Sequence, residues 1–139
     1  MTETVRRAFA DLSIGQVHYA SCGDAGAPAV LLHQTPRSWL EYRAVLPLLG
    51  RRWRAIAIDT PGFGDSAPLP GPASIEGRAA VAAELLETLA IPHAHVVGHH
   101  TGGVIALHLA AAFAPRVASL VLSSTPFVDE ALRHSQRAV

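Results

Sequence analysis

The stretch HVVGHHTGG, at positions 95–103, has the residue types and spacing of a site for covalent chemistry. Apolar, strand-like residues run into a turn that carries Gly98, Gly102 and Gly103, and a helix-like apolar run follows. A strand, a sharp glycine turn and a helix form the elbow that presents the serine of G-x-S-x-G motifs in strained backbone geometry. His100 occupies the central position of this turn, so the stretch predicts an exposed, reactive imidazole.

An imidazole at position 100 has three interpretations. A histidine with a pKa near ~6.5 can act as a general base or form a transient acyl or phosphoryl adduct. It can also bind a ligand without hydrolysing it, or be the remnant of a site that has lost its activity. The elbow alone does not choose among these, since a fold does not fix a function.

Eight histidines raise the question of a metal site. His93 and His95 enter the elbow strand while His99 and His100 leave it, and the two pairs lie about 15 Å apart at the rise of an extended strand. His33 ends another apolar run, so it would meet His99 and His100 if the two strands are neighbours. Zinc needs three or four such ligands. We predict no metal, and we favour structural roles for His33 and His99 over this three-histidine alternative.

The elements around the elbow predict an α/β fold. Short apolar runs predict strands over residues 29–33, 53–59, 94–98 and 117–124, preceded by a β-rich segment at 16–23. Helical spacing predicts helices over residues 38–49, from a cap at Ser74 to near Pro92, and over 102–114. Strands alternating with helices give a mostly parallel sheet with helices on both faces.

Five motifs occur in a fixed order between Gly15 and Pro126: VHYASCGD, LLHQTPRS, AIDTPGFGDS, VVGHHTGG and ASLVLSSTP. In this order they resemble the N-terminal part of the α/β-hydrolase-fold superfamily, in its cap-bearing esterase, epoxide hydrolase and haloalkane dehalogenase type. The resemblance implies a hydrolase of a small ester or a related acyl, epoxide or halide substrate. We expect no cofactor, because no phosphate-binding GKS or GKT loop is present.

The resemblance also assigns roles to particular positions. His100 falls at the nucleophile position, where the family has Ser, Asp or Cys. The backbone N–H groups of Thr35 and Thr101 would form the oxyanion hole. Gln34 replaces the usual glycine and adds an amide that can hydrogen-bond a ligand. The positions expected to contact substrate are His33, Gln34 and His99.

The resemblance divides the chain into residues 1–126, the N-terminal part of the core, and residues 127–139, a linker or first helix toward a cap. In the family, the acid and the catalytic histidine lie beyond the cap, so we expect no triad hydrolysis from these 139 residues alone. The alternative is a non-hydrolytic ligand-binding or vestigial module. An uncovered edge at the strand over 117–124 would favour self-association.

Composition narrows the remaining possibilities. Eleven basic and eleven acidic side chains cancel, which argues against a nucleic acid or anionic membrane partner. The single Cys22 fits a reducing cytoplasm. The N-terminus lacks the apolar segment of a signal peptide, and the longest apolar run, 102–114, falls short of the ~20 residues of a membrane span. We predict a cytoplasmic protein with a small-molecule substrate.

Three further features favour structural interpretations. His108 lies in the apolar helix and is expected to be a core histidine. Asp59 and Asp65 flank the turn TPGFG and are expected to make turn and loop hydrogen bonds. The segment GFGDSA matches a dinucleotide fingerprint, but a proline-rich loop follows it where that fingerprint requires a helix.

Overall fold

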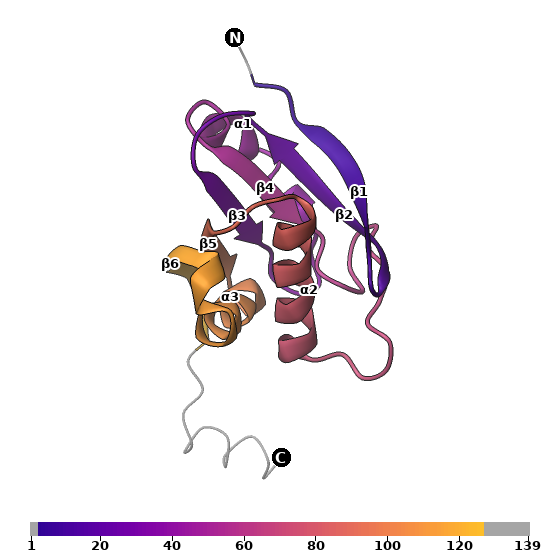
Figure 1. Cartoon of the computed structure of the whole chain (residues 1–139). Coiled ribbons are helices and arrows are strands. Elements are labelled where there is room, and N and C mark those ends of the chain that lie inside the picture. The colour runs from indigo at the N-terminus through magenta and orange to yellow at the C-terminus, as the bar shows by residue number, and fades with distance from the viewer. Residues whose placement is uncertain (1–2, 127–139) are drawn as a thin grey trace.

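The computed structural model describes residues 3–126, and its strands form one six-stranded sheet in the order β1-β2-β4-β3-β5-β6 (Figure 1). Strands β4, β3, β5 and β6 are parallel, and β2 runs antiparallel to both β1 and β4. The mostly parallel sheet of the predicted α/β fold is therefore confirmed. The strands are β1 (Arg6–Leu12), β2 (Gly15–Cys22), β3 (Pro28–Leu32), β4 (Arg54–Ile58), β5 (Ala94–His99) and β6 (Val117–Ser123).

Two longer helices pack side by side on one face of this sheet, α2 and α3 (Figure 1). The predicted cap of α2 is confirmed, because the Ser74 hydroxyl accepts a hydrogen bond from the Gly77 amide at 3.0 Å. The helical segments are η1 (Trp39–Tyr42), α1 (Leu46–Leu49), α2 (Ile75–Thr88), α3 (Thr101–Ala112) and η2 (Ala114–Arg116).

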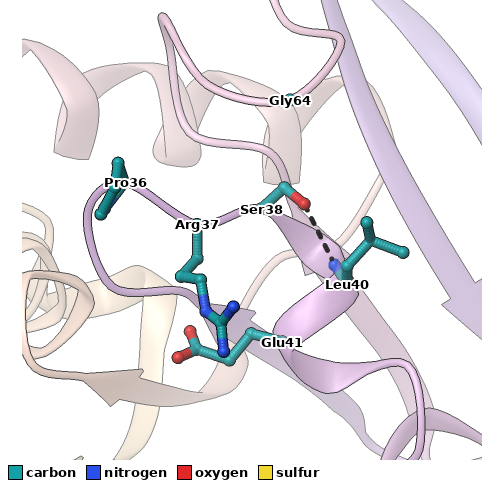
Figure 2. A pocket seen from close by; sticks show the side chains of 6 residues that line it. All are labelled: Pro36, Arg37, Ser38, Leu40, Glu41 and Gly64. Carbon is teal, nitrogen blue, oxygen red and sulfur yellow. Dashed lines mark hydrogen bonds between the residues drawn. The ribbon is translucent and has the colours of Figure 1, made fainter.

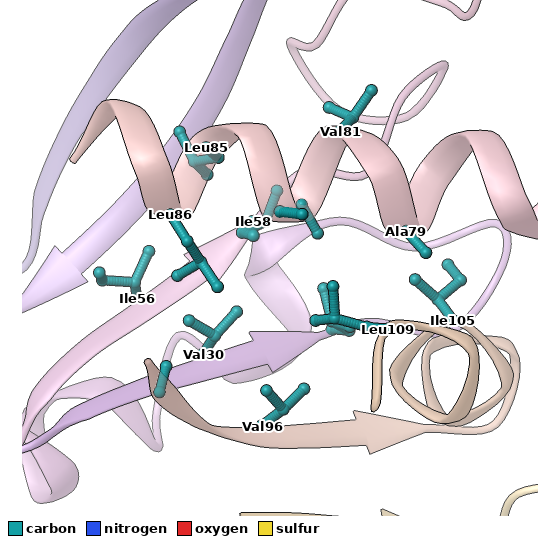
Figure 3. Packing of buried hydrophobic residues seen from close by; sticks show 14 of the residues in the cluster. Val30, Ile56, Ile58, Ala79, Val81, Leu85, Leu86, Val96, Ile105 and Leu109 are labelled. Carbon is teal, nitrogen blue, oxygen red and sulfur yellow. The ribbon is translucent and has the colours of Figure 1, made fainter. Parts of the chain in front are cut away.

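Each face of the sheet carries its own apolar core. The larger core lies between the sheet and helices α2 and α3, where Val30 and Ile56 point toward Leu86 (Figure 3). The smaller core, on the other face, includes Leu31 from β3 and Leu46 from α1. Because successive side chains of a strand point to opposite faces, β3 contributes to both cores. This arrangement confirms helices on both faces.

The predicted helix over residues 38–49 is wrong. The segment forms the short 3-10 turn η1 and the single helical turn α1 instead. Pro47 explains the interruption, because it has no N–H to donate to the carbonyl of Arg43 and fits only the first turn of a helix. The consequence for the site is that Glu41 lies in a tight turn rather than along a continuous helix.

Strand β1 was not predicted. It pairs with β2 along its whole length, but Ala10 is its only buried residue, so it shows no apolar run. The expectation for His108 is also wrong, because this side chain is half-buried rather than in the core.

Strand β6 forms one edge of the described sheet, and its Val121 side chain is 53% exposed. The prediction of an uncovered apolar edge agrees with this, while self-association stays a prediction. The predicted linker at 127–139 lies outside the described residues. Within residues 3–126, no helix has the length and apolar character needed to cross a membrane.

Candidate active site at the elbow

His100 has the backbone geometry of an elbow, with φ 52° and ψ −117°. A non-glycine residue in such a conformation costs about 1–3 kcal/mol and persists only where its surroundings hold it. Here the His100 N–H donates to the Ser123 carbonyl at 2.9 Å, and the His100 carbonyl accepts from the Gly103 N–H at 2.9 Å. These bonds tie the elbow to the end of β6 and to the start of α3, and the His100 side chain stays exposed.

Three glycines allow the elbow to pack this tightly. A Cβ atom on Gly98 would overlap the carbonyl of Gly102, and one on Gly102 would overlap the carbonyl of Leu32. A Cβ atom on Gly103 would overlap the Thr125 hydroxyl. The glycine spacing seen in the sequence therefore has the predicted reason, which is close approach between the helix and the neighbouring strands.

Thr101 connects the elbow to the loop that follows β3. Its hydroxyl lies 3.3 Å from His100 Nδ1 and also accepts a hydrogen bond from the Thr35 N–H at 3.4 Å. The Thr101 N–H lies in the first turn of α3, where a helix offers no internal acceptor. The two residues predicted to form the oxyanion hole, Thr35 and Thr101, are thus adjacent to each other and to His100.

His33 is part of the support beneath this site. Its side chain is only 1% exposed, and both ring nitrogens are bonded. Nδ1 donates to the Gln34 carbonyl at 2.8 Å, and Nε2 accepts from the Thr60 N–H at 3.0 Å. This geometry gives His33 a structural role and argues against the predicted role in substrate binding.

Acidification is expected to destabilise the fold through His33. Burial lowers the pKa of His33 below its ordinary value of 6.5. The unfolded chain therefore takes up a proton first, so the free energy of unfolding falls as pH drops from about 6.5 toward the folded-state pKa, and this contribution is intact above that range.

Urea unfolding at a series of pH values checks this expectation. His33→Asn should show a flatter pH dependence than the wild type, because asparagine does not titrate in this range. His93→Asn is the matched control at an exposed position and should keep the wild-type slope. Identical slopes for the wild type and both variants would contradict the assignment.

Glu41 is a site residue that the sequence did not reveal. Its Oε2 accepts a hydrogen bond from the Gln34 N–H at 2.8 Å, and its Oε1 lies 4.0 Å from His99 Nε2. The other ring nitrogen of His99, Nδ1, lies 3.0 Å from the Ser123 hydroxyl. The fold thus brings two of the predicted substrate-contacting residues, Gln34 and His99, to one carboxylate.

A cavity of about 430 Å³ opens beside the loop that follows β3 (Figure 2). Ligand-binding clefts for small molecules have volumes of about 300–1,000 Å³, so its size suits a small substrate. Figure 2 shows the Arg37 side chain extending toward Glu41 at its wall. The cavity is lined by Pro36, Arg37, Ser38, Leu40, Glu41 and Gly64.

Asp59 organises the loops at this end of the sheet. Its carboxylate is buried and accepts hydrogen bonds from the Trp39 N–H at 2.7 Å and the Asp65 N–H at 3.0 Å. It also bonds His18 Nδ1 at 2.8 Å. The structural interpretation of Asp59 is confirmed, while the participation of His18 was not predicted.

The three-histidine metal alternative finds no support in the geometry. Among residues 3–126, the ligand-type side chains whose candidate atoms all lie within 4.8 Å of one another are His18, Asp59 and Asp65. That cluster fits a cation poorly, because one ring nitrogen of His18 bonds Asp59 and the other accepts from the Arg7 guanidinium at 3.0 Å.

Comparison with known proteins agrees with the fold described above. The family model described as alpha/beta hydrolase fold matches residues 28–137. The soluble epoxide hydrolase of a Corynebacterium species is 38% identical over 96 residues, which cover 68% of this chain and 33% of that protein.

Solved structures agree with the sequence comparison. Wild-type Cfl2 from Burkholderia cenocepacia is 34% identical with a TM-score of 0.82, over 88% of this chain and 42% of that one. The N-acyl homoserine lactonase AidH, complexed with N-butanoyl homoserine, is 30% identical with a TM-score of 0.81, over 87% of this chain and 45% of that one. The chain spans less than half the length of each of these three proteins.

Proposed function

This chain belongs to the α/β-hydrolase fold family, and on that premise we propose that it carries the elbow of a hydrolase whose reacting group is His100. The substrate we propose is a small ester or a related electrophile such as a lactone or an epoxide. The names of two similar proteins, an epoxide hydrolase and an N-acyl homoserine lactonase, support this substrate class.

The observation that carries the proposal is the strained, exposed conformation of His100. Non-glycine residues held in strained backbone conformations cluster at active sites. The side chain stands at the N-terminus of α3, whose free amides and positive dipole end favour a developing negative charge.

In the proposed reaction, His100 acts as a nucleophile. With the proton on Nδ1, donated to the Thr101 hydroxyl, Nε2 keeps a lone pair that attacks the carbonyl carbon of the ester. An Nε2–C bond forms, the ester C–O bond breaks, and the alkoxide leaves. Loss of the Nδ1 proton to solvent gives a neutral acyl-imidazole, which water then hydrolyses.

The oxyanion of this reaction is assigned to two backbone amides. The Thr35 N–H makes only a long 3.4 Å bond to the Thr101 hydroxyl, so it can exchange that bond for one to the oxyanion. The Thr101 N–H is the second donor. Gln34 and His99 are proposed to contact the substrate, and His33 to support the loop from below.

Removing the imidazole tests the proposal. With p-nitrophenyl acetate, the wild-type chain is expected to release nitrophenolate, and the acetyl group on His100 is expected to be short-lived because water hydrolyses the acyl-imidazole. His100→Ala should lower the release at least about 10-fold, because the nucleophile of the first step is removed. His93→Ala, at an exposed position outside the elbow, should react like the wild type. Equal release from His100→Ala and wild type would refute the role.

A non-hydrolytic binding module is the second candidate, favoured by the histidine that occupies the nucleophile position of the family. It predicts saturable binding of an ester or lactone with no release of nitrophenolate and no acetyl-His100.

We also propose a cytoplasmic location, supported by the buried, free thiol of Cys22. A disulfide at Cys22 in protein isolated from cells would argue against this location.

A further inference from the structure

A second group of reactive side chains lies next to the elbow, on three different elements. Ser123 ends β6, His99 ends β5 and Glu41 lies in η1. The Ser123 hydroxyl is 3.0 Å from His99 Nδ1, and His99 Nε2 is 4.0 Å from Glu41 Oε1. The order hydroxyl, imidazole, carboxylate is that of a catalytic triad, which is recognised by geometry rather than by sequence position.

Several bonds hold this group in place. His99 and Ser123 are direct cross-strand partners in the parallel pairing of β5 with β6. The Ser123 carbonyl accepts from the His100 N–H at 2.9 Å, which fixes the backbone that carries the hydroxyl. Glu41 is anchored through its other oxygen by the Gln34 N–H. The side chains of Glu41 and His99 are 13% and 32% exposed, so their interaction is partly shielded while reagents still reach the imidazole.

The carboxylate selects the useful tautomer of His99. His99 Nε2 lies 4.0 Å from Glu41 Oε1, too far for a hydrogen bond but close enough for the negative charge to favour a proton on Nε2. In that tautomer Nδ1 has a free lone pair, which the Ser123 hydroxyl, 3.0 Å away, is placed to donate to. A hydroxyl that donates to an imidazole in this way is an activated nucleophile.

The same two strands contain a natural control. His95 and Ser119 are also cross-strand partners, and their Nδ1 and Oγ atoms lie 2.6 Å apart. The His95 ring packs edge-on against Trp53, with ring centroids 5.1 Å apart. Within residues 3–126, His95 forms no ion pair with a carboxylate. The two pairs therefore share their geometry and differ in the acidic partner.

We propose that Ser123, His99 and Glu41 form a second nucleophilic site, which takes activated phosphonyl compounds. With a phosphonyl fluoride, Ser123 Oγ attacks phosphorus, an O–P bond forms and the P–F bond breaks. The hydroxyl proton passes to His99 Nδ1 and then to solvent, and fluoride leaves. This site goes beyond the proposed function, because none of its steps uses the His100 side chain.

The test is labelling of the full chain with a fluorophosphonate, followed by peptide mapping of the modified serine. Ser123 is expected to react faster than Ser119, by about the factor that Glu41→Gln loses, because both serines have a histidine base and only His99 has a carboxylate beside it. His99→Gln should slow labelling of Ser123 at least about 10-fold. Glu41→Gln, whose amide oxygen can still accept from the Gln34 N–H, should slow it by a smaller factor.

Matched variants separate this site from the elbow. His95→Gln should leave the labelling of Ser123 unchanged, and so should His100→Ala. Equal labelling of Ser119 and Ser123 in the wild-type chain would overturn the proposal, as would labelling of Ser123 that His99→Gln does not slow. The comparison of the two serines needs no variant, so it decides the question even if His99→Gln fails to fold. Loss of ester reactivity in His100→Ala tests the elbow alone.

Discussion

Gly102→Ala is expected to destabilise the folded chain by about 3 kcal/mol or more, at the upper end of the range for overpacked sites. An added Cβ would overlap the carbonyl of Leu32 and crowd that of His33. Both atoms belong to the backbone at the end of β3, so no side chain can rotate to make room. Relief requires α3 and β3 to move apart, which would also separate Thr101 from Thr35.

Gly71→Ala is the control for this substitution. Gly71 has φ 83°, and a Cβ atom there meets nothing within 4 Å. Only the backbone conformation is then strained, at about 1–2 kcal/mol for an L-residue in the left-handed region. Urea unfolding followed by circular dichroism measures both variants. A loss for Gly102→Ala no larger than that for Gly71→Ala would show that the elbow and β3 are less tightly packed than the structure indicates.

Asp59→Ala is expected to cost about 3 kcal/mol or more, because its buried carboxylate accepts several hydrogen bonds and each buried donor left unsatisfied costs about 1–3 kcal/mol. The carboxylate accepts hydrogen bonds from Trp39, Asp65 and His18. Its removal leaves three buried or half-buried donors without an acceptor. Each unsatisfied donor lowers the stability of the folded chain. Because the Trp39 bond anchors η1, the loss should also release Glu41 from the site.

Asp24→Ala is the matched control for this carboxylate. Asp24 pairs with Arg6 at 3.5 Å, but its side chain is 84% exposed, so solvent screens the pair. Its removal should change the free energy of unfolding by no more than about 0.5 kcal/mol. Asp59→Asn should fall between the two, because the amide keeps one acceptor. Equal unfolding midpoints for Asp59→Ala and Asp24→Ala would contradict the organising role of Asp59.

Much of the elbow can be predicted from the sequence, because its determinants are local. The three glycines around His100, the apolar run before them and the helix after them lie in one continuous segment, from Ala94 to Ala112. The cap at Ser74 is equally local. The order of the five motifs was also sufficient to predict the mostly parallel sheet, since each of its buried strands is a short apolar run and the two longer helices have helical apolar spacing.

Other parts of the molecule depend on which segments meet in space. Strand β1 has a single buried residue, and it is a strand because β2 pairs with it. From the sequence, His33 is a candidate metal ligand or substrate contact. The structure shows that its Nε2 accepts a hydrogen bond from the Thr60 N–H. On the predicted helix over residues 38–49, Glu41 gave no sign of a role in the site. In the structure Pro47 interrupts that helix, and the turn η1 places the Glu41 carboxylate beside Gln34 and His99.

The sequence alone therefore determined the elbow and the position of His100 on it, because backbone strain, glycine spacing and strand periodicity act between residues close in the chain. Only the tertiary structure decided that Ser123 stands opposite His99 and that Glu41 faces that histidine. Those contacts join residues 24 and 58 positions apart, and they exist because β6 pairs with β5 in one particular register while η1 packs beside β3. A cross-strand register is a property of two segments together, which neither segment encodes by itself.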